Sequence, residues 1–219
     1  VTLGSNDVPN SSKTLTASTV TFDNTVNAAT AGAQSLVVAG DTVFNNTVGA
    51  TTKLGALSVS GTTTFNAGAV SVDTTNSNGG TGNQTYSGLV TLNDNEALTA
   101  SGAGMIALNG GLTGNGKTLT ISAPTAVNLG DGLGADSLTG LSTVDVTSTG
   151  GISIKASAID SSGASQRYRN AVTLGSNDVP NSSKTLTAST VTFDNTVNAT
   201  TAGAQSLVVA GDTVFNNTV

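Results

Sequence analysis

The sequence contains no cysteine, no histidine and no tryptophan, and only 3% of its 219 residues are aromatic. The absence of cysteine excludes a disulfide framework and a thiolate metal site. Charged residues make up 9% of the chain, far below the roughly one quarter found in ordinary globular domains. The net charge of −6 is unfavourable for binding nucleic-acid phosphates. No apolar run reaches the length of about 18 residues that predicts a membrane-spanning helix, so we expect no membrane insertion in this segment.

Threonine, serine, asparagine, alanine and valine dominate what remains, together with 27 glycines. A disordered chain would carry more charge and less valine. A composition rich in β-branched and small polar residues favours short strands that are joined by tight turns. The composition therefore predicts an all-β protein.

The longest internal repeat is nearly perfect. Val1–Val48 recurs as Val172–Val219, and the single difference is Ala29 against Thr200. The shift from residue 1 to residue 172 defines a 171-residue unit, so the chain holds one full unit, 1–171, and 172–219 begin the next. Because the repeat is cut at both ends of the sequence, we expect the native protein to continue in both directions.

A half-repeat lies inside this unit. Gln84–Leu92 resembles Gln166–Leu174, which begins 82 residues later. This offset divides the unit into parts of about 89 and about 82 residues. Tandem β-sandwich domains of these two sizes are one architecture that this division allows.

A shorter period runs through the apolar residues. All five phenylalanines fall on one ladder with a step of about 21 residues, as Phe22, Phe44 and Phe65 and again as Phe193 and Phe215. A leucine series shares this step, in Leu15, Leu36 and Leu57 and in Leu98 and Leu119. Periods of about 20 to 50 residues are typical of solenoids, in which each turn buries its apolar face against its neighbours.

We therefore predict an all-β, right-handed parallel β-solenoid, a β-helix with about 21 residues per rung. The phenylalanine and leucine series should form buried columns, and Leu129 should join the core. About eight rungs per unit at roughly 4.8 Å would give a length near 40 Å. Polar residues that follow strands are expected at the corners, where asparagine can bond to the neighbouring rung: Asp23, Asn45, Asn66, Asn93 and Asn109.

Three segments carry a resemblance to a known family. They are Thr19–Val26 (TVTFDNTV), Thr62–Val70 (TTTFNAGAV) and Gln84–Leu92 (QTYSGLVTL). The sequence resembles the central repeats of filamentous-haemagglutinin-like exoproteins, which are exported by two-partner secretion, and of related autotransporter passengers. The resemblance covers essentially the whole chain. It implies a right-handed β-helix, export across the outer membrane, and a role in attachment, aggregation or biofilm.

Candidate chemistry is sparse. Catalytic carboxylates would have to cluster, and the close acidic pairs are Asp94 with Glu96 and Asp131 with Asp136, which we expect to be solvated corner residues. Asp131 and Asp136 are also calcium candidates, because residues 132–138 match most of a β-roll motif. That motif binds calcium through successive copies, and here it stands alone. We expect no catalytic residue, metal or cofactor, and thus no enzyme.

One basic and aromatic cluster stands out in the acidic chain. Arg167, Tyr168 and Arg169 form a candidate contact patch, or they cover a solenoid corner with their apolar stems.

The expected function is that of a repetitive stalk in an extracellular fibre on a bacterial surface. A self-assembling filament is the alternative. The expected partners are further repeats of the same chain, neighbouring fibres or a surface receptor.

Overall fold

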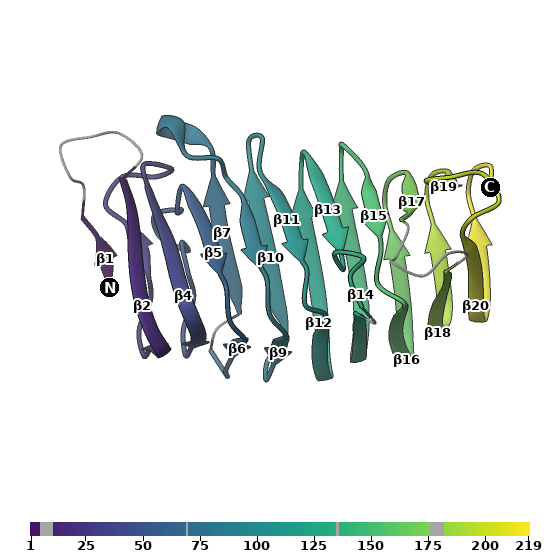
Figure 1. Cartoon of the computed structure of the whole chain (residues 1–219), viewed down its shortest axis with the longest axis horizontal. Helices are drawn as coiled ribbons and strands as arrows, with labels where there is room; N and C mark the ends of the chain where they lie inside the picture. Colours follow the sequence, from purple (N-terminus) through teal and green to yellow (C-terminus); the bar gives the residue numbers. More distant parts are fainter. Residues whose placement is uncertain (5–10, 69, 135, 176–181) are drawn as a thin grey trace.

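The computed structural model describes residues 1–4, 11–68, 70–134, 136–175 and 182–219. The chain winds into a rod, and successive turns follow one another from the N-terminal to the C-terminal end (Figure 1). All strand pairings in the described chain are parallel. The fold is a parallel β-solenoid, as the composition and the short period predicted.

Twenty strands and one short 3-10 helix, η1, build the described part of the rod. Their bounds are β1 (Thr2–Leu3), β2 (Ser11–Phe22), β3 (Asn27–Ala28), β4 (Gln34–Phe44), β5 (Ala56–Val59), β6 (Thr63–Phe65), β7 (Ser71–Thr75), η1 (Ser77–Gly79), β8 (Gln84–Tyr86), β9 (Val90–Leu92), β10 (Glu96–Ser101), β11 (Met105–Leu108), β12 (Leu112–Ala123), β13 (Ala126–Leu129), β14 (Ser137–Ser148), β15 (Ile152–Ile154), β16 (Ala158–Tyr168), β17 (Val172–Leu174), β18 (Ser183–Phe193), β19 (Val197–Ala199) and β20 (Ser206–Phe215).

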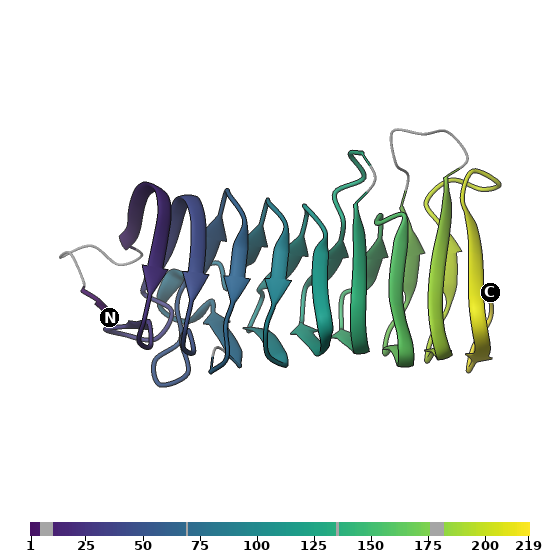
Figure 2. The ribbon, with the colours of Figure 1, turned by 90° about the horizontal axis from the view of Figure 1, so that it is seen from below.

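Three faces enclose the core, as the strand pairings define them. The chain coils along the rod from face to face (Figure 2). Each face holds a column of nine inward residues, one per turn of the described chain. Face 1 stacks Leu15, Val38, Val59, Tyr86, Leu108, Leu129, Ile154, Leu174 and Ala199. Face 2 stacks Val20, Thr42, Thr63, Val90, Leu112, Leu138, Ile159, Leu186 and Val209. Face 3 stacks Val26, Val48, Val72, Leu98, Ile121, Val146, Tyr168, Phe193 and Phe215.

The turns are slightly longer than the leucine spacing suggested, at roughly 23 residues. Leu98 is paired with Ile121, and Leu119 is paired with Glu96. The predicted Leu98–Leu119 column is therefore wrong by two residues in register, although Leu36 does pair with Leu57. Side chains alternate between the two faces of a strand, so an offset of two residues keeps both leucines inside.

The aromatic residues form two stacks. On face 2, the rings of Phe22 and Phe44 are 5.2 Å apart, and those of Phe44 and Phe65 are 5.6 Å apart. On face 3, Phe193 stacks on Tyr168 at 5.4 Å and on Phe215 at 5.2 Å. The near-parallel rings repeat at the distance between turns. Thus the predicted stacking of phenylalanines is confirmed, but in two columns instead of one.

Most of the predicted ladder is buried. Each buried member is at most 5% exposed: Phe22, Phe44, Phe65, Leu36, Leu57, Leu98, Leu119, Leu129 and Phe193. Leu15 is 38% exposed and Phe215 is 42% exposed, so their expected burial is wrong. Both lie in the outermost described turns, where no further described turn covers them. Leu186, which repeats Leu15 inside the rod, is fully buried.

Asparagine side chains bond from turn to turn along the corner between faces 2 and 3. Asn45 donates to Asp23, Asn66 to Asn45, Asn93 to Asn66 and Asn115 to Asn93, over distances of 2.9, 2.7, 2.8 and 3.1 Å. Asn115 adopts a left-handed conformation with φ of 48°. It takes the place that Asn109 was predicted to hold, since Asn109 lies one corner earlier, after face 1.

The parallel coil excludes the tandem β-sandwich, which requires antiparallel sheets packed face to face. The chain covers one full 171-residue unit with a continuous core, and the buried columns run on into residues 182–199. Within the described residues, no helix is long and apolar enough to cross a membrane.

The aromatic stack provides a direct test of the fold. Phe44→Ala removes the ring between Phe22 and Phe65, and we expect the free energy of unfolding to fall by about 3–5 kcal/mol. The neighbouring Val43 points outward and is partly exposed. Val43→Ala should therefore cost about 1 kcal/mol or less. Urea unfolding of both variants measures the difference, and equal losses would contradict the inward stacking of Phe44.

Candidate functional site

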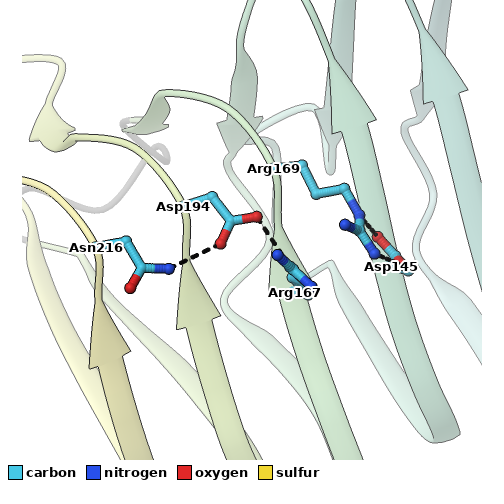
Figure 3. Close-up of polar contacts among 5 residues, drawn as sticks. All are labelled: Asp145, Arg167, Arg169, Asp194 and Asn216. Carbon is cyan, nitrogen blue, oxygen red and sulfur yellow. Dashed lines mark hydrogen bonds and ion pairs between the residues drawn. The ribbon is translucent and has the colours of Figure 1, made fainter.

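The basic patch is a set of ion pairs that bridge neighbouring turns (Figure 3). The Arg169 guanidinium donates two hydrogen bonds to the Asp145 carboxylate, at 2.7 and 2.6 Å. The Arg167 guanidinium donates to Asp194 at 2.9 Å, and Asp194 also accepts a hydrogen bond from Asn216 at 3.0 Å. These hydrogen bonds lower the pKa of Asp194, and the bond to Asp145 raises the pKa of Arg169. The positive charges are thus neutralised within the chain.

Tyr168 is not part of an exposed patch, so its assignment as a contact residue is wrong. Its ring is fully buried, because it alternates with Arg167 and Arg169 along the chain and points to the opposite side of β16. The hydroxyl donates to Gln166 at 2.9 Å. Burial raises the pKa of Tyr168 far above its ordinary value. Arg167 and Arg169 remain on the surface, where the arginine side chains of the two ion pairs are 46% and 37% exposed.

Asp131 and Asp136 do meet, at the loop between β13 and β14. The backbone N–H of Asp131 donates to the Asp136 carboxylate at 3.2 Å, and the N–H of Leu133 donates to Asp131 at 2.6 Å. Partial burial and the nearby Asp131 raise the pKa of Asp136. Ala135, inside the β-roll-like motif, lies outside the described residues. Among the described residues, no group of three or more metal-ligating acids is present.

Glu96 is the acid that departs most from expectation. It was expected at a solvated corner, but its side chain points into the core and is 2% exposed. Neither carboxylate oxygen has a hydrogen-bond partner among the described residues. Burial, and then the charges of Asp94 and Asp73, raise its pKa to about 9. The position pairs with Leu119, so an acidic side chain occupies a site that suits leucine.

Two buried glutamines were not singled out from the sequence, although both belong to the half-repeat. The Gln84 amide donates to the carbonyls of Val72 and Thr99, at 3.0 and 2.9 Å, and Tyr86 donates to its oxygen at 3.1 Å. Gln166 makes equivalent contacts with the carbonyls of Ile159 and Thr187, at 2.9 and 3.0 Å. The shared spacing of glutamine and tyrosine thus reflects a buried bracing contact and not a binding site.

Comparison of the chain with protein-family models, with curated proteins and with solved structures finds no match. The surface arginines and the corner asparagines bind groups on neighbouring turns, and the buried glutamines hold strands together.

The Asp131–Asp136 loop makes a calcium prediction possible. Two carboxylates that already accept backbone N–H groups provide too few oxygen ligands, since calcium takes about six to eight. Adding millimolar calcium should leave the melting temperature unchanged, and Asp136→Ala should respond to calcium as the unsubstituted chain does. A calcium-dependent rise of several degrees, lost in Asp136→Ala, would contradict this reading.

The buried Glu96 makes a prediction about pH. Its pKa is about 9 in the folded chain against an ordinary 4.5, so the folded carboxyl stays protonated while the unfolded one ionises. The free energy of unfolding should fall as pH rises from 4.5 to 9. At pH 7 the loss is on the order of 3 kcal/mol. Glu96→Gln should remove most of this dependence and should stabilise the fold more at pH 8 than at pH 5.

Asp94→Asn is the matched control for this measurement. Asp94 is partly exposed, and hydrogen bonds from the backbone of Asn95 and Gly68 lower its pKa. Removing its charge weakens the repulsion on Glu96 slightly, so the fall in stability with pH should persist. Parallel stability–pH curves for Glu96→Gln and the unsubstituted chain would refute the assignment to Glu96.

Proposed function

We propose that this chain is a structural segment of a long extracellular fibre on a bacterial surface, in which it acts as a repetitive stalk. The supporting observation is the continuous core, whose three columns run through all the described turns without an end cap inside the 171-residue unit. A solenoid of this kind gains length by adding turns, because each turn contacts only its neighbours. The resemblance to filamentous-haemagglutinin-like repeats points in the same direction.

The surface chemistry supports a stalk over an enzyme. The arginines are paired with aspartates across turns, and the corner asparagines bond to one another. Surface groups committed to neighbouring turns stiffen the rod, and both arginines are already paired instead of facing a substrate. The partners we propose are therefore further repeats of the same chain, with a receptor or a neighbouring fibre contacted elsewhere along it. Nucleic acid is disfavoured by the net charge of −6.

A self-assembling filament is the second candidate. Its support is a set of outward apolar side chains on the surface of the rod, where Val70, Leu89 and Leu133 are 45%, 42% and 62% exposed. Apolar side chains that face solvent can be buried against a neighbouring fibre. In that case the filament itself would be the product, rather than a stalk that carries a binding domain.

Fibre length against repeat number separates these functions. Seven turns separate Val20 from Leu186 on face 2, and the unit ends one face further on, so it spans about seven and one third turns instead of the predicted eight. At roughly 4.8 Å per turn, each added unit should lengthen the fibre by about 35 Å instead of 40 Å. Removing one unit from the native fibre should shorten it by this step, leave the remaining turns folded and reduce attachment only through lost reach. Electron microscopy of the fibres, with a cell-attachment assay, makes both measurements.

Complete loss of attachment after removal of a single unit would mean that the repeats themselves carry the receptor site. Filaments with several chains in cross-section would favour self-assembly instead. A single thin rod whose attachment falls gradually with length is the expected outcome.

A further inference from the structure

The two copies of the 48-residue segment lie on different faces of the rod. Phe22 lies on face 2, at the start of the Phe22–Phe44–Phe65 stack. Phe193, its copy one unit later, lies on face 3, between Tyr168 and Phe215. The same sequence has therefore moved to the next face.

Every described strand of the segment moves in the same sense. β1 and β3 lie on face 3, and their copies β17 and β19 lie on face 1. β2 runs from face 1 to face 2, whereas its copy β18 runs from face 2 to face 3. The displacement is thus one face, or one third of a turn, throughout.

Local structure survives this displacement unchanged. Lys13 pairs with Leu36 as Lys184 pairs with Leu207. Gly40 has a φ of 145° and its copy Gly211 has a φ of 144°. In both places an added Cβ would collide with the carbonyl oxygen of the turn before, from Ala17 or Ala188. The same sequence therefore adopts the same local structure on either face.

Counting turns gives the same displacement. Along face 2, seven turns separate Val20 from Leu186, and the copy of Phe22 lies one face further on. The half-repeat agrees, because Tyr86 lies on face 1 and Tyr168, after three turns and two more faces, lies on face 3. This half therefore spans three and two thirds turns, and two halves of that length make seven and one third turns.

We propose that consecutive units are related by a rotation of one third of a turn, so that each outward group of the unit is presented on three sides of the fibre in succession. This deepens the proposed function and rests on the chain being a fibre segment. The helix η1 illustrates it: here it projects between β7 on face 3 and β8 on face 1, and in the next unit it projects between faces 1 and 2.

The surface that results suits partners that approach from every side. Identical groups recur at steps of about 35 Å around the rod, but on one side they recur only after three units, which at roughly 4.8 Å per turn is about 106 Å. A flat partner on one side thus meets every third unit. A neighbouring fibre finds the same groups whichever side it contacts.

Cysteine pairs in the 219-residue chain test the rotation, and the chain provides a clean background because it has no cysteine. Thr190 lies beside Ser165 on face 3. If units instead repeated after whole turns, Thr190 would follow its copy Thr19 onto face 2, where it would lie beside Ala158. Neighbouring strands bring Cα atoms within the range of about 4.4–6.8 Å that a disulfide requires.

We expect the pair S165C/T190C to oxidise in the folded chain and the pair A158C/T190C to remain reduced. T99C/S122C, on adjacent turns before the second copy, should close in either arrangement and is the matched control. Closure of A158C/T190C would overturn the rotation. So would failure of both Thr190 pairs in a chain whose control pair closes. The crosslinks report only on which face of the rod the second copy lies. They are therefore independent of fibre length and attachment, on which the proposed function depends.

Discussion

The structure depends on the parallel registration of consecutive turns. Backbone bonds such as those from Asn45 to Phe22 and from Asn66 to Phe44, both 2.9 Å, place each residue beside its counterpart one turn away. Because the strands are about 4.8 Å apart, like side chains stack directly on one another. This one constraint accounts for the phenylalanine stacks, the asparagine corner and the ion pairs between turns.

Registration also decides which polar groups the core tolerates. Gln84 and Gln166 can be buried because their side-chain amides donate hydrogen bonds to backbone carbonyls of strands on two sides. Glu96 has no such partner among the described residues and stays protonated instead, since an ionised carboxylate in an apolar interior is far more costly than a neutral one. These buried polar side chains are thus either hydrogen-bonded, as the glutamines are, or kept uncharged, as Glu96 is.

The sequence was sufficient to predict the solenoid and most of its core, because the phenylalanine and leucine spacings record the turn length. It was not sufficient for the register. Leu98 and Leu119 keep the spacing of the leucine series but belong to neighbouring columns, and alternation places both inside in either register. The inward direction of the Tyr168 and Glu96 side chains was also missed. Alternation along a strand predicts which side chains point inward only when one inward residue of that strand is already known. Spacing alone also suggested one phenylalanine column, because it carries no information on which face a turn begins.

The equivalence of the faces changes what tandem duplication requires of this fold. If a repeated segment had to return to its own face, only insertions of whole turns, roughly 23 residues or multiples of it, would preserve the columns. Here Phe193 finds a stacking partner in Tyr168 on face 3 as readily as Phe44 finds Phe22 on face 2, with ring distances of 5.4 and 5.2 Å. A unit needs only to end on some face, so duplications in steps of a third of a turn keep the core continuous. The 171-residue unit, at seven and one third turns, is such a length, and it lets the solenoid lengthen by duplication without a matching change in its turns.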